Sequence, residues 1–178
     1  MNIHFETERF ILRDLEESDT DGIFLLDSDP EVHKFLGNKP IKTKEEALAT
    51  ILKVRDQYVK NGIGRWAIIE KTTNEFVGWT GLKYEEGLRA EFNYYDLGYR
   101  LRKKFWGQGI ATQTALISLG FGFEEMKLDE IGAAADIQHV VSNKILKKIG
   151  LQFVENFEFE GDLCNWYKLT KKDWLKSL

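Results

Sequence analysis

A glycine-containing turn just past the middle of the chain is the first stretch whose residues could do chemistry. Residues 103–112 read KKFWGQGIAT and lie between an extended segment and a segment with helical spacing. The first N–H groups of a helix have no partner within it, so they suit a phosphate, and glycine lets a phosphate approach the backbone closely. Arg102, Lys103 and Lys104 add positive charge at the same end. The turn therefore either binds a phosphate group or leads into an ordinary helix.

Two common phosphate-binding motifs do not fit this turn. A P-loop ends in Gly-Lys-Ser/Thr, whereas Gly109 is followed by Ile110 and Ala111. The dinucleotide-binding fingerprint needs glycine or alanine where this chain has Thr112, although Asp129 supplies an acidic residue about twenty positions later. Neither motif accounts for the turn.

The segments around the turn predict a mixed α/β (α+β) fold. Apolar periodicity and turn residues predict strands at 10–15, 66–70, 76–84, 91–101, 131–135, 153–159 and 165–169. The same reasoning predicts helices at 18–26, just after Pro30, and at 43–61, 111–126 and 141–149. This order predicts a mixed, mostly antiparallel sheet of about seven strands with helices on both faces. It does not match the regular alternation of a dinucleotide-binding fold.

Local signals mark several ends of these elements. Thr43 and Glu46 form a capping-box pattern at the start of a helix, and Gly62 ends that helix. Asn74 tolerates the left-handed conformation of a tight turn, which predicts a hairpin between the strands on either side of it. Gly98, inside a long extended segment, is a candidate for a β-bulge.

The composition narrows the class of protein. The 178 residues are 43% hydrophobic and 30% charged, which predicts a single globular domain over residues 1–178. A net charge of −4 argues against a nucleic-acid partner held by a general basic field. No window reaches the roughly 18 apolar residues that a membrane span needs. A single cysteine, Cys164, and the absence of a signal-peptide pattern predict a cytoplasmic protein.

The flanks of the turn resemble one protein family. The matching stretches are Thr7–Arg13 (TERFILR), Val77–Leu82 (VGWTGL), Asp96–Leu101 (DLGYRL), Lys104–Gly109 (KFWGQG) and Ser142–Leu151 (SNKILKKIGL). Together and in this order they resemble the GNAT superfamily of N-acetyltransferases, in particular its RimJ/RimL-type branch, named for enzymes that acetylate the N-termini of ribosomal proteins. The pyrophosphate loop of that superfamily reads Gln/Arg-x-x-Gly-x-Gly/Ala, and this chain has lysine in the first place.

The resemblance implies a fold, a cosubstrate and a reaction. Acetyl-CoA would donate its acetyl group directly to a primary amine while its thioester lies between two splayed strands. A backbone N–H near Tyr99 to Leu101 would bond the thioester oxygen. The residues that the resemblance assigns to acetyl-CoA are Tyr99, Leu101, Arg102, Lys104, Trp106, Gly107, Gln108, Gly109, Ile110, Ala111, Thr112, His139, Ser142 and Lys148. The protein would act as a monomer or homodimer.

The acceptor is left open by the resemblance. The RimJ/RimL-type branch favours the α-amine at a protein or peptide N-terminus over a small-molecule amine. A non-catalytic acyl-CoA-binding module is a further alternative, because Lys104, His139 and Leu146 depart from the residues usual at these places.

The resemblance also suggests a group that stabilises the leaving thiolate of CoA. Many superfamily members place a tyrosine where this chain has Leu146, which cannot donate a proton. The branch instead has the pattern Asn-x-x-Ser, and His139 to Ser142 aligns with it, with histidine in place of asparagine. Ser142 therefore either stabilises the thiolate or bonds the backbone near a helix start. His139 would either hold the pantetheine arm of CoA or cap that helix.

The general base is not singled out by the sequence. Asp96, Glu158 and Glu160 are candidates, and each is also explained as an ordinary surface or salt-bridged carboxylate. Lys148 either contacts the 3′-phosphate of CoA or is solvated on a helix face. Cys164 lacks a neighbouring histidine, which argues against a nucleophilic role. Five aromatic residues either line an acceptor pocket or pack in the core: Trp66, Trp79, Tyr94, Tyr95 and Tyr99.

Overall fold

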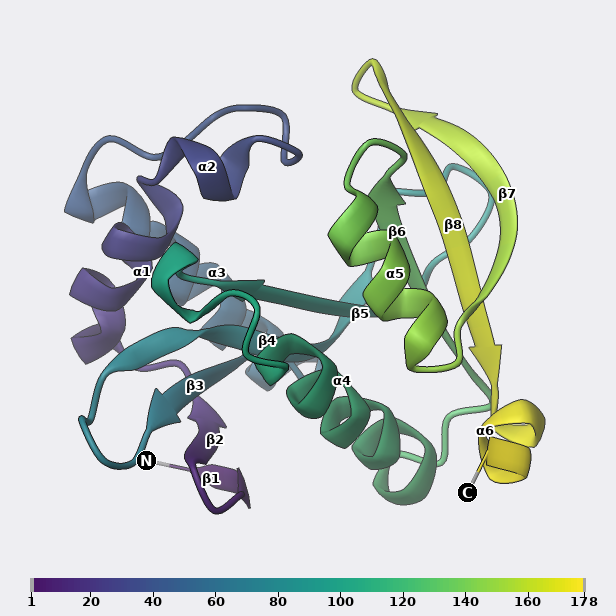
Figure 1. Ribbon diagram of the computed structural model, residues 1–178, viewed down its shortest axis with the longest axis horizontal. Helices are drawn as coiled ribbons and strands as arrows, with labels where there is room; N and C mark the ends of the chain where they lie inside the picture. The colour runs from purple at the N-terminus through teal and green to yellow at the C-terminus, as the bar shows by residue number, and fades with distance from the viewer. Residues whose placement is uncertain (1, 178) are drawn as a thin grey trace.

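The computed structural model describes residues 2–177 and contains one eight-stranded sheet (Figure 1). Its strands are β1 (Ile3–Glu6), β2 (Phe10–Asp14), β3 (Trp66–Glu70), β4 (Phe76–Glu85), β5 (Tyr94–Leu101), β6 (Glu130–Asp136), β7 (Gln152–Phe159) and β8 (Asp162–Thr170). Their order across the sheet is β1-β2-β3-β4-β5-β6-β8-β7. The seven predicted strands are all present, and β1, which the sequence reasoning missed, pairs antiparallel with β2 at the edge.

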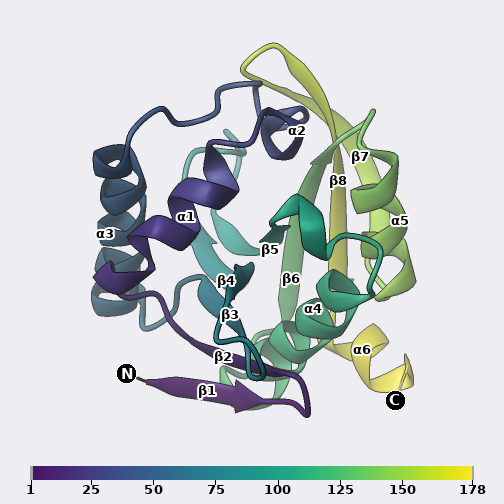
Figure 2. The ribbon, with the colours of Figure 1, turned by 60° about the vertical axis from the view of Figure 1, so that its left-hand side comes forward.

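Helices cover both faces of the sheet, as the sequence predicts. The helices are α1 (Thr20–Asp27), α2 (Pro30–His33), α3 (Lys44–Asn61), α4 (Ile110–Gly120), α5 (Val140–Lys148) and α6 (Lys171–Ser177). Successive side chains of a strand point to opposite faces. Accordingly Trp66 and Ile68 of β3 pack in a core with α4 and α5, while Ala67 and Ile69 pack in a second core with α1 to α3. Figure 2 shows the two groups of helices on either side of the sheet.

Most predicted helix and turn signals are confirmed. Thr43 and Glu46 form the reciprocal capping box at the start of α3, and Gly62 ends α3 in the left-handed conformation. Asn74 also has a positive φ, 56°, in the turn between β3 and β4. The helix predicted at 111–126 is present as α4 followed directly by a π-helical turn over Phe121–Glu125. The C-terminal α6 was not predicted.

Two neighbouring strands part in the middle of the sheet. β5 and β6 form a parallel pair, and Asp96 opposite Gly132 is the register contact recorded between them within residues 2–177. Beyond this point the strands diverge, and Figure 1 shows β5 and β6 running in clearly different directions. A Cβ on Gly132 would lie 2.1 Å from the Trp166 ring and 2.8 Å from the Tyr94 ring. Glycine is therefore required where the two halves of the sheet meet.

The predicted bulge at Gly98 is wrong. β4 and β5 keep continuous register from Gly78 opposite Leu101 to Glu85 opposite Tyr94. Glycine is needed at this position for a different reason, because a Cβ on residue 98 would lie 2.6 Å from the guanidinium of Arg65. The missing side chain leaves room for a buried arginine beneath the strand.

We expect Gly132→Ala to destabilise the protein by roughly 1–3 kcal/mol, because the added methyl group would push against two packed rings. Gly120→Ala is the matched control, since its Cβ would meet no atom closer than 3.9 Å and alanine favours a helix. Urea unfolding should show a loss of stability for the first variant and a gain of up to about 1 kcal/mol for the second. Equal stabilities of the two variants would contradict this account of the strand junction.

Candidate active site

A cavity of about 1240 Å³ runs along the gap between the parted strands, from the glycine turn to the hairpin of β7 and β8. Most of the predicted site residues line it: Asp96, Tyr99, Leu101, Trp106, Gly107, Gln108, Gly109, Ile110, Ala111, Thr112, His139, Ser142 and Glu160. Arg102, Lys104 and Lys148 are not among its lining residues. The structure therefore gathers residues from distant parts of the sequence into one groove and leaves three predicted basic contacts outside it.

The glycine turn presents free backbone donors to this cavity. Gly107 and Gly109 have φ values of 72° and 77°, and Gly109 precedes the first residue of α4. Within residues 2–177, no hydrogen bond is recorded for the backbone N–H groups of 107–112. A Cβ on either glycine would meet no atom within 4 Å, so these positions need glycine for backbone conformation rather than for space within the protein. The helix start and the open donors together suit a pyrophosphate.

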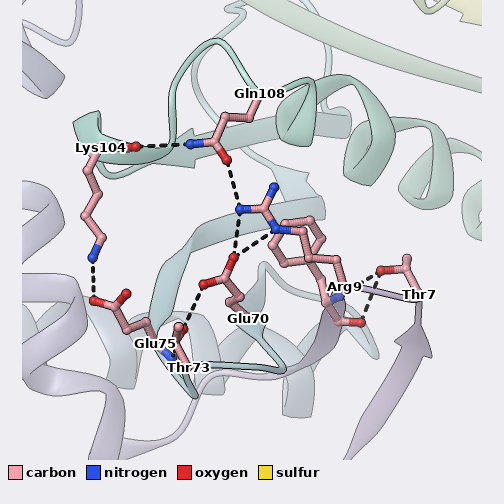
Figure 3. Close-up of polar contacts among 8 residues, drawn as sticks. Thr7, Arg9, Glu70, Thr73, Glu75, Lys104 and Gln108 are labelled. Atoms are coloured by element: carbon pink, nitrogen blue, oxygen red, sulfur yellow. Dashed lines mark hydrogen bonds and ion pairs between the residues drawn. The ribbon is translucent and has the colours of Figure 1, made fainter.

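The basic side chains beside the turn are already engaged. Lys104 Nζ lies 2.5 Å from a carboxylate oxygen of Glu75 (Figure 3), and Arg102 donates to the carbonyl of Phe76 at 2.9 Å. Trp106 Nε1 donates to the carbonyl of Leu101 at 2.8 Å. At the turn itself, the donors that face the cavity are therefore backbone N–H groups rather than the side chains of Arg102 and Lys104. The lysine at the first motif position holds the outside of the loop.

Tyr99 and Ser142 meet across the gap between the strands. The Tyr99 hydroxyl, on β5, lies 3.2 Å from both the carbonyl oxygen and the Oγ of Ser142 in the first turn of α5. Burial raises the pKa of Tyr99 to about 12, so its hydroxyl keeps its proton at neutral pH. Two hydroxyl groups therefore stand together where β5 and β6 have separated.

His139 caps α5, which is one of its two predicted roles. Its Nδ1 accepts the N–H of Ser142 at 3.4 Å, and its ring stacks on Phe35 with the ring centroids 4.6 Å apart. Burial lowers the pKa of His139, which favours the neutral ring that capping requires. The stack joins the segment after α2 to the start of α5 across the cavity.

Asp96 is not a free carboxylate. It forms a buried ion pair with Arg65, and Arg65 also donates to the Asp96 carbonyl at 2.7 Å. The other carboxylate oxygen accepts from the Tyr94 hydroxyl at 3.2 Å. Both oxygens are thus engaged, so Asp96 would have to leave one of these partners to take a proton from an acceptor. Its physical role is to hold the strands together where they part.

The two glutamates predicted as bases lie near the β7–β8 hairpin. Glu160 is exposed in the turn, with a φ of 49°, and lines the outer end of the cavity. Glu158 is exposed on β7 and is not a lining residue. Neither is held by a recorded ion pair within residues 2–177. Glu160 is therefore the one of the two that lines the cavity.

The aromatic candidates divide between core and cavity. Trp66 is fully buried and Tyr94 is buried against Trp166, whereas Trp79 and Tyr99 line the cavity. Tyr95 packs against the core and does not line the cavity.

Cys164 also lines the cavity, and burial raises the pKa of its thiol, which keeps it in the weakly nucleophilic protonated form. No cluster of His, Cys, Asp and Glu side chains suitable for a metal occurs among the described residues. None of the helices described is long and apolar enough to cross a membrane.

Two residues of the site escaped the sequence reasoning. Arg65 immediately precedes the apolar strand 66–70, and a charged residue at that place is a signal of a buried ion pair. Its partner, Asp96, is 31 positions away, so only the pairing of strands brings them together. Phe35 gave no signal, because its contact with His139 depends on the path of the segment after α2.

Comparisons with known proteins identify the family. A model of the acetyltransferase (GNAT) domain matches residues 9–152. An N-acetyltransferase of Bacillus subtilis, YoaA, is 30% identical over 148 residues, which cover 83% of this chain and 81% of that protein. The FsC-acetyl coenzyme A-N(2)-transacetylase of Aspergillus fumigatus is 29% identical and covers 85% of this chain and 69% of its own.

Solved structures share the fold at lower identity. A GNAT-family acetyltransferase from Bacillus anthracis has a TM-score of 0.78 and 23% identity, covering 97% of this chain and 99% of its own. RimL, a ribosomal L7/L12 α-N-protein acetyltransferase solved with coenzyme A, has a TM-score of 0.76 and 17% identity. The match covers 95% of this chain and 98% of the RimL chain. Spermidine N-acetyltransferase from Vibrio cholerae, solved with CoA and spermine, has a TM-score of 0.74 and 14% identity. The match covers 95% of this chain and 99% of that enzyme.

The parted strands, the glycine turn at the start of α4 and the family match over most of the chain lead to one conclusion. This chain belongs to the GNAT family and is an acetyltransferase that takes acetyl-CoA as its acetyl donor.

Proposed function

We propose that the protein transfers the acetyl group to the α-amine of a protein or peptide N-terminus, as a cytoplasmic enzyme of the RimJ/RimL-type branch. The observation that carries this proposal is the engagement of Asp96. The carboxylate at the point where the strands part is held by Arg65 and Tyr94, so it is not free to take a proton from the acceptor. An acceptor that is already partly neutral at pH 7 is therefore favoured.

The pKa of the acceptor decides how much help it needs. An α-amine of pKa about 8 is roughly 10% neutral at pH 7, whereas a lysine-type amine of pKa about 10.4 is less than 0.1% neutral. The difference corresponds to about 3 kcal/mol. In a site without a strong base, the rate of acetyl transfer therefore falls far less for an α-amine than for a lysine-type amine.

Relatives support two acceptor classes. RimL acts on the α-amine of a ribosomal protein, which agrees with the proposal, and it shares the fold of this chain. The spermidine N-acetyltransferase shares the same fold, and the Aspergillus relative acetylates an N(2) position, so a small-molecule amine is the second candidate. The engaged state of Asp96 favours the first.

The chain's own groups suggest how each part of acetyl-CoA is held. The backbone N–H groups of 107–112 would bind the pyrophosphate. Beyond Asp96 the β6-facing edge of β5 has lost its partner strand, so an N–H near Tyr99 to Leu101 is free to bond the thioester oxygen. Because that oxygen gains negative charge as the amine attacks, a fixed donor there would stabilise the transition state.

Ser142 and Tyr99 are placed to receive the leaving group. As the bond between the acetyl carbon and sulfur breaks, the Ser142 hydroxyl would donate a hydrogen bond or its proton to the thiolate. The protonated Tyr99 hydroxyl, 3.2 Å from Ser142 Oγ, would in turn donate to Ser142. The amine loses its proton to water or to an exposed carboxylate such as Glu160.

The glycine turn can be tested by ligand-induced stabilisation. CoA at about 100 times its Kd should add about 2.7 kcal/mol, and the Tm should rise by roughly 5–10 °C. Gly107→Ala should remove most of this rise, because alanine disfavours the positive φ that aims the N–H groups. Gly62→Ala is the matched control, since its φ is 71° and its Cβ would also meet open space, but it ends α3 away from the cavity. An undiminished rise in Gly107→Ala would contradict the assignment.

Ser142→Ala should lower kcat about 100-fold, the lower end for acid catalysis because a thiolate of pKa near 8.5 leaves readily. The Kd for acetyl-CoA should stay unchanged. Tyr99→Phe should give a smaller fall of the same kind, since it acts through Ser142. Steady-state kinetics with released thiol as the signal would measure both. An unchanged kcat in Ser142→Ala would remove the serine from the mechanism.

The acceptor class can be tested with a panel of amines at equal concentration. A peptide with a free α-amine should give the highest kcat/KM, and its kcat/KM should rise with pH and level off near about 8, the pKa of the amine. The comparison set is the same peptide with its α-amine blocked and a lysine added, together with spermidine. Higher kcat/KM for either of these would favour the other acceptor class. No thiol release with any amine would refute the proposal.

A further inference from the structure

Arg9, in the turn between β1 and β2, reaches the glycine turn although it is 99 residues away in sequence. Its Nη2 donates to Gln108 Oε1 at 2.8 Å, and Figure 3 shows the two side chains pointing toward each other. Gln108 is the residue between the two glycines of the turn. A contact to this side chain therefore acts on the middle of the loop.

The amide of Gln108 is held at both ends. While its Oε1 accepts from Arg9, its Nε2 donates to the backbone carbonyl of Lys104 at 3.2 Å. Since the oxygen meets a donor and the nitrogen meets an acceptor, the contacts fix which way the amide points. The Gln108 side chain thus ties the turn to the start of its own loop and to the N-terminal strands.

Arg9 itself is fixed from the other side. Its Nε donates to Glu70 Oε1 at 2.8 Å, and the second oxygen of Glu70 accepts from the Thr73 hydroxyl at 2.8 Å. These hydrogen bonds, first from Thr73 and then from Arg9, lower the pKa of Glu70, so it is charged at neutral pH. The carbonyl of Arg9 also accepts the N–H of Lys71 at 2.9 Å. The guanidinium is therefore anchored to β3 before it reaches the loop.

We propose that Arg9 is a positioning residue for acetyl-CoA, because it holds the phosphate-binding turn in its binding conformation through Gln108. The inference rests on the proposed role of the turn. Two of the donor groups of Arg9 are used by Glu70 and Gln108, and the charge of Glu70 offsets that of the guanidinium. Arg9 therefore acts by ordering the loop rather than by adding positive charge to the cavity.

The test compares Arg9→Met, Gln108→Met and the double variant by calorimetric titration with CoA. Each single variant should bind CoA about tenfold more weakly, the effect of losing one hydrogen bond to a charged group. The double variant should be no weaker than Gln108→Met, because the loss of Arg9 removes nothing further from the loop once the Gln108 amide is gone. KM for acetyl-CoA should rise while kcat at saturation stays unchanged. Amide hydrogen exchange of residues 105–110 in the free protein should become faster in Arg9→Met.

Two controls separate this role from others. Lys71→Met removes the neighbouring ion pair with Glu6, 2.9 Å long, without touching the loop, and should leave the Kd unchanged. Dephospho-CoA should lose affinity by the same factor as CoA. A loss confined to CoA would assign Arg9 to the 3′-phosphate instead and overturn the proposal.

The remaining outcomes are equally informative. An unchanged Kd in Arg9→Met, or losses that add in the double variant, would refute the action through Gln108. If the unsubstituted protein itself bound no CoA, the proposed role of the turn would fail instead of the inference about Arg9.

Discussion

The site depends on the point where β5 and β6 stop pairing. Asp96 opposite Gly132 is where a continuous sheet becomes two halves that diverge. The junction is held by a buried ion pair between Arg65 and Asp96 and closed on the other side by Trp166 packed over Gly132. Removing one partner of a buried ion pair commonly costs about 3–5 kcal/mol, so this junction resists separating further. The gap beyond it is consequently a fixed feature of the fold.

Three sets of contacts then shape the gap for acetyl-CoA. Tyr99 and Ser142 join its two walls where the thioester would lie, while the stack of Phe35 on His139 joins them near α2. The glycine turn closes the far end, and Arg9 ties that turn to the N-terminal strands. Each half of the sheet therefore contributes one side of the groove, and the contacts between halves are made by side chains rather than by strand pairing.

The local parts of this arrangement could be predicted from the sequence, and the long-range parts could not. The capping box of Thr43 and Glu46 and the turn at Asn74 are set by neighbours within four residues, so their residue types are sufficient. The ion pair of Asp96 depends on Arg65, and the two residues meet only because β3 pairs with β4 and β4 pairs with β5. The bulge predicted at Gly98 was wrong for the same reason. The guanidinium of Arg65 occupies the space beside Gly98, and Arg65 is distant in sequence. The residues of the groove could be predicted from the family resemblance. The contacts of Lys104 with Glu75 and of Arg102 with Phe76 could not, because they depend on where the side chains lie in the folded protein.

The most direct measurement of the central claim is a crystal structure of the protein with CoA. We expect the pyrophosphate on the N–H groups of 107–112 and the sulfur within hydrogen-bond reach of the Ser142 hydroxyl, with the Arg65–Asp96 pair and the Arg9–Gln108 contact unchanged. A CoA whose sulfur lies outside the gap between β5 and β6, or whose pyrophosphate lies away from the turn, would contradict it.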